Sequence, residues 1–518
     1  MVTLFASRAR AVWQAHTALR VMWAAALLVL TATCATAQTN LIVTPTSLTF
    51  NAQIGGPAQE SQTVSVVALV AGVPLPVQLN YTVTTSTVSG GNWLSATPGS
   101  GATPRVETVS VNTAGLAVGT YTGSVTVSSS GAVSYSVSVT LIVVRENEQL
   151  PIVVDANFYP LTRPPCVRPY SAVYNNIQAA IGASTTPAGA TIVVCPGNYA
   201  EQVTINKSLT LQGVTNAAAN KGAVVITVPP SGLSVSNGFY FANSFQVVAV
   251  QALVQASNVN IVDVAVDGTG AFTGCSSPSL VGVGFDTGSS GTLRRVAVRN
   301  QNIPDGSGGY CGTNSNPPFG SGIVSQSLGS VTVQDSSVRG FTWSGFENTQ
   351  QAPISIVIKT SVFVPINGAF AQQCVSVAGA FTLQFSNNTV TNCFLGLDLG
   401  SNPNITITGN TITNTLVGIA CSGFCRVGNV SNNTIASNHT IAGNPSSGIG
   451  NFLGPSYWLG TTFQYNDISG TAYGISISGL GDTISYNTIN DANVGIFGVT
   501  GNTVSNNTFL NVTTLTTQ

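Results

Sequence analysis

Charge is what this sequence lacks most. Its 518 residues include only 15 Lys and Arg and 16 Asp and Glu, so 6% of the chain is charged, whereas about 25% is usual in a soluble domain. A coiled coil needs Glu and Lys beside its apolar seam, and a charge-rich disordered chain needs even more of them, so both classes are excluded. The formal net charge of −1 also argues against a nucleic-acid-binding protein, which would carry a basic stripe.

Long apolar runs are also missing, apart from one near the N-terminus. Residues 21–30 form an apolar run about half as long as a membrane-spanning helix. Three arginines precede it and an Ala-Thr-Ala sequence at 35–37 follows it, which is the layout of a secretory signal peptide. We predict that residues 1–37 are an export signal; a membrane anchor and a lipid anchor on Cys34 are the alternatives. No later stretch is long enough to span a bilayer.

Histidine is the third scarcity. Beyond the predicted signal, which removes three arginines, there remain 12 basic residues, 16 acidic residues, eight cysteines and one histidine, His439. His439 lies among Ser, Asn and Thr residues typical of a surface loop, and no second histidine completes a zinc site. Serine–histidine and zinc chemistry are therefore disfavoured.

Residues 40–145 alternate apolar and polar side chains at the period of a β-strand. The alternation is clearest at 63–67, 107–111 and 121–127, and Gly-rich turns separate these segments. Several short strands of this kind predict an immunoglobulin-like β-sandwich.

The sandwich carries a resemblance to a known module. The sequence Asn-Trp-Leu-Ser-Ala-Thr-Pro-Gly-Ser-Gly at 92–101, followed by Val-Ser-Val-Asn at 109–112 and Gly-Thr-Tyr-Thr-Gly at 119–123, resembles the BACON-type module of secreted bacterial proteins. The resemblance implies glycan binding, with Trp93 as a platform on which a sugar stacks; a core position in the sandwich is the alternative for Trp93. The charged residues 145–148 and the following Pro151 indicate a linker over residues 146–165.

A repeat dominates the rest of the chain. Six segments share an asparagine followed two residues later by an apolar residue, and the steps between the asparagines are 22, 23, 33, 21 and 20 residues. A period near 22 predicts the coils of a parallel β-helix, in which stacking buries one continuous core and the asparagines form an inward column. The asparagines are Asn388, Asn410, Asn433, Asn466, Asn487 and Asn507.

This repeat resembles that of right-handed β-helix proteins of the pectin lyase-like superfamily, and we assign it to residues 166–518. The Gly-x-Tyr-x-Glu run at 197–201, after apolar residues with helical spacing at 174–181, resembles the N-terminal cap of pectinesterase-like members. The fold class expected is therefore all-β, an immunoglobulin-like β-sandwich followed by a right-handed parallel β-helix.

The superfamily resemblance implies three reaction types. The Gly-His-Gly motif of its hydrolases is absent, and so are the later pectinesterase signatures Asp-Phe-Ile-Phe-Gly and Gly-Arg-Pro-Trp. Lyase chemistry needs a base, commonly Arg or Lys, and often calcium held by carboxylates, and the composition allows both. Calcium is therefore a candidate cofactor, without an assigned site.

Charged residues recur at two positions of the repeat. Asp263, Arg295, Asp335 and Lys359 align in alternating sign, which predicts a stacked ion-pair column that stabilises the surface.

Four residues further on, Asp267, Arg299 and Arg339 align at the strand exit, and they are the candidate catalytic residues. Long insertions at 268–281, 300–321 and 436–447 leave this corner, and insertions on one edge of a solenoid commonly build its binding face. Asp305 and Tyr310 of the second insertion are candidate carbohydrate contacts. The alternatives are that the loops only shield the sheet edge, and that Arg339 pairs with Asp305 or Glu347.

An even number of cysteines in an exported protein indicates disulfides between neighbours in the sequence, with metal binding as the alternative. The expected pairs are Cys166 with Cys195, Cys275 with Cys311, Cys374 with Cys393, and Cys421 with Cys425.

Two functions remain. One is a secreted protein that binds an acidic, pectin-like polysaccharide, and that cleaves it by lyase chemistry if it is catalytic. The other is a non-catalytic glycan-binding or adhesive rod. In both, the partner is a polysaccharide or cell-surface glycan, and we expect an extracellular or surface-attached monomer without a membrane span and without nucleic-acid binding.

Overall fold

A computed structural model shows an almost entirely β protein. It describes residues 39–54, 61–70, 78–130, 132–144, 150–156, 166–167, 169–215, 223–236, 247–312, 317–349, 355–366, 371–380, 382–402, 404–426, 428–437, 445–452 and 456–517. The predicted signal peptide, the charge cluster at 145–148 and His439 lie outside these ranges. The chain divides into two compact units, Met1–Glu148 and Gln149–Gln518.

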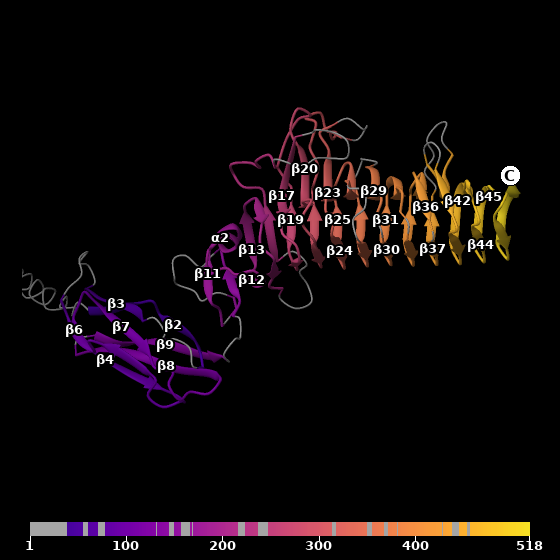
Figure 1. Ribbon diagram of the computed structural model, residues 1–518. Coiled ribbons are helices and arrows are strands. Elements are labelled where there is room, and N and C mark those ends of the chain that lie inside the picture. Colours follow the sequence, from indigo (N-terminus) through magenta and orange to yellow (C-terminus); the bar gives the residue numbers. More distant parts are fainter. Residues whose placement is uncertain are drawn as a thin grey trace, which may run out of the picture. The chain divides into compact units, whose positions relative to one another are not determined.

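The N-terminal unit is a β-sandwich of two sheets (Figure 1). All strand pairs are antiparallel except β2 with β9. Alternate residues of the facing strands, such as Val64, Val66 and Val125, are fully buried between the sheets. The first sheet contains β1 (Thr39–Thr44), β3 (Gln62–Val70), β7 (Arg105–Val111) and β5 (Leu94–Thr97); the second contains β2 (Ser47–Gln53), β9 (Ala132–Val144), β8 (Gly119–Ser129), β4 (Asn80–Thr87) and β6 (Ser100–Ala102).

The second unit is a parallel β-helix, as the repeat predicts. Each typical coil adds one strand to each of three parallel stacks, so successive coils pair through their backbones. The first stack is a 14-stranded sheet of β11 (Ala172–Tyr174), β10 (Ile152–Val154), β12 (Ala190–Val194), β15 (Leu209–Gly213), β18 (Val259–Val262), β21 (Gly291–Arg294), β24 (Ser330–Gln334), β27 (Ser355–Lys359), β30 (Leu383–Ser386), β33 (Ile405–Thr408), β37 (Gly428–Ser431), β41 (Thr462–Gln464), β44 (Thr483–Ser485) and β46 (Thr503–Ser505).

The other two stacks merge into one 21-stranded sheet. The second stack contains β13 (Gly197–Ala200), β16 (Val224–Thr227), β19 (Ala265–Asp267), β22 (Ala297–Arg299), β25 (Ser337–Arg339), β28 (Val362–Val364), β31 (Thr389–Thr391), β34 (Thr411–Thr413) and β38 (Thr434–Ala436). The third contains β14 (Val203–Ile205), β17 (Val248–Val254), β20 (Ser279–Phe285), β23 (Gly320–Ser325), β26 (Ser344–Asn348), β29 (Ala371–Val377), β32 (Cys393–Leu399), β35 (Val417–Cys421) and β39 (Ser447–Asn451). Three long strands bend from the second stack into the third: β42 (Asp467–Ser476), β45 (Thr488–Phe497) and β47 (Thr508–Thr517).

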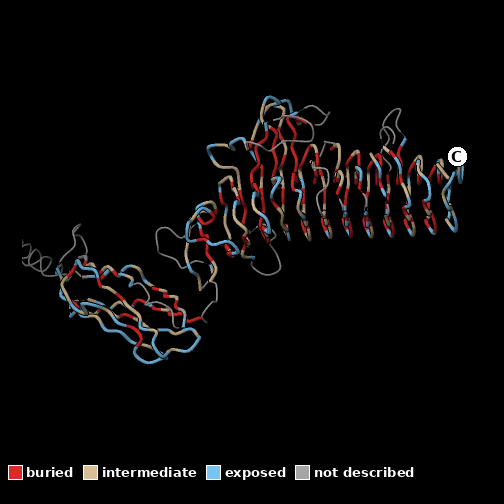
Figure 2. Tube along the Cα trace, in the orientation of Figure 1, coloured by how far each residue is buried: buried red, intermediate tan, exposed pale blue. Residues whose placement is uncertain are grey.

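One apolar core runs through the coils. Phe346, Val375, Leu397 and Ile419 are paired in register from β26 to β35, and all are fully buried. Figure 2 shows these buried segments repeating from coil to coil along the solenoid. Each coil therefore completes its core only by packing on its neighbours.

The predicted asparagine column is confirmed. The side-chain amide of Asn410 donates to the carbonyl oxygen of the Asn433 side chain at 2.8 Å and to the backbone oxygen of Phe385 at 2.9 Å. Its own Oδ1 accepts from the backbone N–H of Asn388 at 2.9 Å and from the Asn388 amide at 3.1 Å. Every hydrogen-bonding position of this buried amide is thus satisfied, and the same pattern links the column down to Asn507.

The N-terminal end of the solenoid differs from the prediction in one respect. Strand β10 lies inside the expected linker of 146–165, yet it pairs with both β11 and β12 and buries all three of its side chains. The linker prediction is therefore wrong at residues 152–154, because this apolar Ile-Val-Val segment joins the first stack.

The expected cap helix is present as α2 (Ile177–Gly182), somewhat later than the predicted 174–181. The side chain of Asn176 caps its N-terminus by accepting from the N–H of Ala179. The carboxylate of Glu201 accepts from the N–H groups of Ile177 and Gln178, both at 2.8 Å. Tyr199 is buried, and its hydroxyl donates to the backbone oxygen of Cys195 at 2.8 Å. The Gly-x-Tyr-x-Glu run thus stabilises the cap.

Candidate functional site

Three charged residues end neighbouring strands of the second stack. Asp267, Arg299 and Arg339 are the last residues of β19, β22 and β25, and the register pairs Asp267 with Arg299 and Arg299 with Arg339. Parallel strands lie about 4.8 Å apart, so the Cα atoms of the two arginines are separated by about one strand spacing. The sequence repeat predicts this alignment correctly.

Asp267 neutralises Arg299. The Arg299 Nε lies 2.7 Å from Asp267 Oδ2. Burial opposes ionisation of Asp267, but hydrogen bonds from Thr269, Asn300 and Arg299 together hold the pKa of its carboxyl below the ordinary value. Asp267 therefore remains ionised at neutral pH, and its carboxylate offsets the charge of Arg299 through the contact at Nε.

Arg339 has no such neighbour. It is exposed, and the next residue of its column is the apolar Val364. Within the described ranges it forms no ion pair, and neither of the two carboxylates considered as a partner, Asp305 of a loop and Glu347 of β26, is bonded to it. Asp305 Oδ1 instead accepts hydrogen bonds from the backbone N–H groups of Ser307 and Gly309. The side chain of Glu347 is buried.

The insertions after β19 and β22 form a small structure of their own beside this column. A disulfide joins Cys275 of the first to Cys311 of the second, with their Cα atoms 5.5 Å apart. Ala271, Leu280 and Ile303 pack with Cys311 into a separate apolar cluster. Figure 1 shows the chain projecting beyond the stacks near β17 and β20. The disulfide therefore holds both insertions at the corner that carries Arg299.

The two predicted carbohydrate contacts lie in the second insertion. Asp305 and Tyr310 flank one turn, closed by a backbone bridge between Pro304 and Tyr310. Hydrogen bonds from the backbone and side chain of Ser307 hold the pKa of Asp305 below its usual range. Asp305 thus has a turn-forming role, and Tyr310 is half-buried; glycan contact by either residue stays a prediction.

The predicted ion-pair column is only partly correct. Arg295 binds Asp263 through two contacts of 2.6 Å. Lys359, however, is the last residue of β27 and pairs in register with Gln334. The column position is a corner with positive φ, at 59° in Asp263 and 53° in Arg295, and Thr360 occupies it with φ 51°. The assignment of Lys359 is therefore wrong by one residue.

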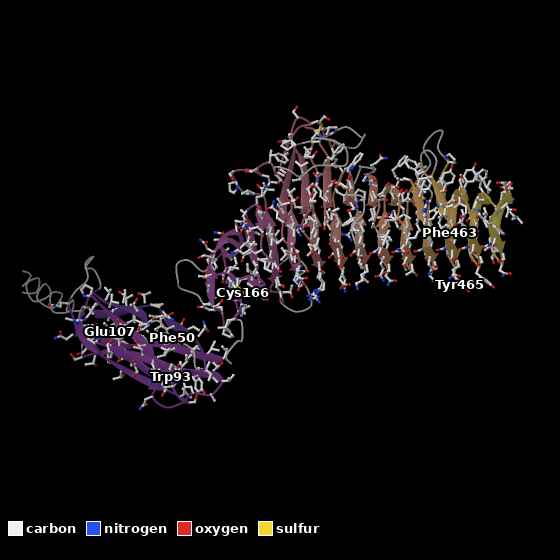
Figure 3. All side chains as sticks on the ribbon, viewed as in Figure 1. Phe50, Trp93, Glu107, Cys166, Phe463 and Tyr465 are labelled. Carbon is white, nitrogen blue, oxygen red and sulfur yellow. A yellow bond between two sulfur atoms is a disulfide. The ribbon has the colours of Figure 1, made fainter. Side chains whose placement is uncertain are left out.

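Trp93 is corrected to a core residue. It is 2% exposed, packs in the interior of the sandwich, and donates its indole N–H to the backbone oxygen of Ser89 at 2.8 Å. Figure 3 shows its place among the strands of the N-terminal unit. A ring enclosed in this way has no face on which a sugar could stack.

Sequence analysis named Glu347 only as an alternative partner of Arg339 and did not connect it with Asp398, yet both acidic residues lie on the outer face of the third stack. Phe346 and Leu397 point into the core, so the residues that follow them, Glu347 and Asp398, point outward by strand parity. Ser376 of β29 lies between them in the register. The signal was available: each acid follows a Gly-apolar pair, which is the second mark of the repeat.

The pKa values of both acidic side chains lie above their ordinary values. Burial raises the pKa of Glu347 to about 7, while hydrogen bonds from Ser344 and Trp343 lower it and the nearby Asp398 raises it. Burial likewise raises the pKa of Asp398 to about 6, against hydrogen bonds from Ser422 and Ser376. Glu347 is 5% exposed, whereas Asp398 is partly open to solvent.

The described residues give no support to calcium. They contain no group of three or more His, Cys, Asp or Glu side chains that could hold a metal ion. All eight cysteines beyond the signal are joined in the four expected disulfides. No helix within the described part of the chain is long and apolar enough to cross a membrane.

Comparison with known proteins gives partial matches. Residues 347–518 match the family described as periplasmic copper-binding protein (NosD). No curated protein matches the chain. Among solved structures, a Bacteroides ovatus GH5 xyloglucanase in complex with a XXXG heptasaccharide is 16% identical over 29% of this chain and 26% of that one, with a TM-score of 0.17. PfbA, a surface adhesin of Streptococcus pneumoniae, is 11% identical over 66% of this chain and 88% of that one, with a TM-score of 0.26.

The chain thus spans about a quarter of the length of that xyloglucanase. The family match and the disulfides fit an extracellular or periplasmic β-helix protein.

Proposed function

We propose that this protein is a secreted β-helix that binds an acidic polysaccharide at the corner carrying Arg299 and Arg339. The observation that carries the proposal is the exposed guanidinium of Arg339, which has no ion pair within the described ranges and follows Arg299 in the column. We also propose that the sandwich is a BACON-type module and that the solenoid is of the pectin lyase-like type.

Electrostatics favours an anion here. Two guanidinium groups on neighbouring strands repel each other unless a negative charge lies between them. Asp267 does not lie between the two arginines; it offsets the charge of Arg299 from the opposite side, and Val364 offers no charge to Arg339. A sugar carboxylate can accept two parallel hydrogen bonds from an arginine, which makes a uronate a suitable ligand. The neighbouring insertions would add contact area.

The test is binding of the purified protein to polygalacturonate and to a neutral polysaccharide, comparing Arg339→Ala with the unaltered protein. Losing a bidentate contact should weaken binding to polygalacturonate by about tenfold, which corresponds to about 1.4 kcal/mol. Binding should also weaken with salt, and the melting temperature should stay unchanged.

Arg294→Ala is the matched control, because Arg294 is an exposed arginine at the end of β21 in the first stack. Equal weakening in both variants would indicate a diffuse charge effect. Unchanged binding in Arg339→Ala, or a loss of stability alone, would overturn the proposed site.

A second candidate function is cleavage, and the pair Glu347 and Asp398 favours it. Their backbones lie two strand spacings apart on one face, about 9.6 Å, and a pair of carboxyl groups on one surface is what glycoside hydrolases use as acid and base. Because Glu347 is 5% exposed, a substrate must first gain access to it, and binding is the better supported proposal. Incubation with a polysaccharide panel, with and without calcium, and detection of reducing ends and unsaturated uronates would separate hydrolase, lyase and binder.

Copper is not carried over from the matched family. The described residues offer no ligand group for it, and the cysteines that could bind a soft metal are oxidised to disulfides. A non-catalytic adhesive rod remains the alternative if binding occurs without products.

A further inference from the structure

A short sheet stands outside the three stacks near the C-terminal end of the solenoid. It contains β36 (Phe424–Arg426), β40 (Tyr457–Leu459) and β43 (Gly479–Leu480). Cys425 and Trp458 are fully buried, so the residues on either side of them point outward. The register places Phe424 beside Tyr457, and Arg426 in one row with Leu459 and Leu480.

The outward side of this sheet is unusually apolar for an exposed surface. Phe424 is 45% exposed, Tyr457 38% and Leu480 64%. Together with Arg426 they form a surface that we call the aromatic–arginine ledge. Contiguous exposed apolar side chains on a soluble protein commonly mark a binding surface.

The ledge is held in place from beneath. The disulfide between Cys421 and Cys425 ties β36 to the third stack. Trp458 packs edge-on against Phe463 of the core, with ring centroids 5.0 Å apart. Above them the rings of Phe424 and Tyr457 stack at 5.8 Å and 24°. A ligand would therefore meet side chains that have already lost most of their freedom, which lowers the entropic cost of binding.

Arg426 gives the ledge its charge. It is the only Lys or Arg in the 159 residues that follow Lys359, so no other permanently charged cation of that stretch shares its role. Its guanidinium carbon lies 5.6 Å from the centre of the Phe424 ring, and it makes no ion pair with a described carboxylate. The contact with Phe424 at an exposed site is worth only about 0.5–1 kcal/mol. Stability is thus a weak reason for an arginine here.

We propose that the aromatic–arginine ledge binds an anionic saccharide. Arg426 pairs with its carboxylate or sulfate group, and Tyr457 and Leu480 contact the apolar C–H groups of the sugar. This inference rests on the proposed polysaccharide binding but assigns it a second surface, built on different strands from the Arg339 corner.

The experiment measures affinity for three oligosaccharides of equal length, one with uronates, one sulfated and one neutral. Arg426→Gln should weaken binding of the anionic ligands by about tenfold and of the neutral one by less than about twofold. The uronate and sulfated arms identify which anion is preferred. Tyr457→Ala should weaken all three, since it removes contact area and leaves the charge.

Tyr465→Asn is the matched control. Tyr465 is 53% exposed and stacks on Tyr486 at 5.3 Å, but it lies on the corner column between β41 and β42 (Figure 3). The corner has positive φ, which asparagine tolerates, so the variant removes one exposed ring without backbone strain. It should bind all three ligands normally. If it weakens binding as much as Tyr457→Ala does, the ledge is not a specific site.

The outcomes separate this inference from the proposed function. If Arg339→Ala weakens binding while Arg426→Gln and Tyr457→Ala bind normally, the corner site stands and the ledge is overturned. If the ledge variants weaken binding and Arg339→Ala does not, the ledge stands alone. Should Arg426→Gln melt at a lower temperature, Arg426→Lys preserves the charge and is expected to bind anionic ligands with intermediate affinity; normal affinity in that variant would exclude a bidentate contact.

Discussion

The carboxyl group of Glu347 is enclosed on the outer face of β26, where charge is costly. Its pKa rises from the ordinary value of 4.5 to about 7 because burial disfavours the ionised form. The folded chain therefore binds more protons than the unfolded chain between about pH 4.5 and pH 7. The stability contributed by protonated Glu347 is fully present below pH 4.5 and is lost as the pH rises through 7.

We therefore predict that the melting temperature falls as the pH is raised from 5 to 8. The difference in unfolding free energy attributable to Glu347 is on the order of 3 kcal/mol, from about 1.4 kcal/mol for each pH unit. Asp398, whose pKa is raised to about 6, acts in the same direction. Glu347→Gln keeps a neutral hydrogen-bonding side chain and should flatten the profile, as followed by circular dichroism. A variant as pH-dependent as the unaltered protein would contradict this assignment.

At the scale of the element, the asparagine column links successive coils through buried side-chain hydrogen bonds, in addition to the apolar core and the backbone pairing. Asn433 accepts two hydrogen bonds from Asn410 and donates to Asn466 and to the backbone oxygen of Ile407. Its loss would remove hydrogen bonds from buried N–H and C=O groups of the two neighbouring coils, at Asn410 and Ile407 in one and at Asn466 in the other.

Asn433→Ala should therefore destabilise the solenoid by at least about 3 kcal/mol, since each unsatisfied buried group costs about 1–3 kcal/mol. Asn507→Ala is the control, because Asn507 is the last rung and is only half-buried. Thermal unfolding should show a large decrease for the first variant and a small one for the second. Equal decreases in melting temperature would mean that asparagine stabilises the corner through its backbone preference and not through the hydrogen bonds of the column.

Sequence predicts this element well because the same side chain recurs at the same coil position. Lys359 shows the limit: the position of the corner is set by backbone φ, and a chemically plausible charge one residue away is mistaken for a member of the column. Glu347 and Asp398 show another, since strand parity predicts that they point outward but not that neighbouring side chains enclose them. Trp93 shows a third, because an alternating pattern does not reveal which large residue fills the sandwich.

At the scale of the whole molecule, the two units have separate apolar cores. The core of the solenoid begins with Ile152 and Val154 of β10, and the hydroxyl of Tyr199 lies 3.2 Å from the backbone oxygen of Val154. The first strand of the solenoid therefore belongs to the segment that sequence analysis assigned to a linker.

A protein comprising residues 149–518 should accordingly fold by itself into a cooperative, β-rich monomer, as judged by circular dichroism and gel filtration. A protein comprising residues 166–518 lacks β10 and should melt at a lower temperature, because β11 loses the strand it pairs with and β12 keeps only β15. If the longer protein is insoluble while the full chain is not, the two units depend on each other. If the two proteins melt at the same temperature, β10 does not contribute to the stability of the solenoid.

Because of the asparagine column, the solenoid tolerates the insertion or deletion of a whole coil better than that of a part of one. A coil presents the same amide donor on one side and the same amide acceptor on the other, so its upper and lower surfaces are interchangeable with those of its neighbours. Duplication or deletion of one repeat of 22 residues, the step from Asn388 to Asn410, recreates the original contacts at the junction. A gain or loss of a few residues within a strand instead breaks every hydrogen bond of that rung. Such a solenoid can lengthen or shorten during evolution by one coil at a time.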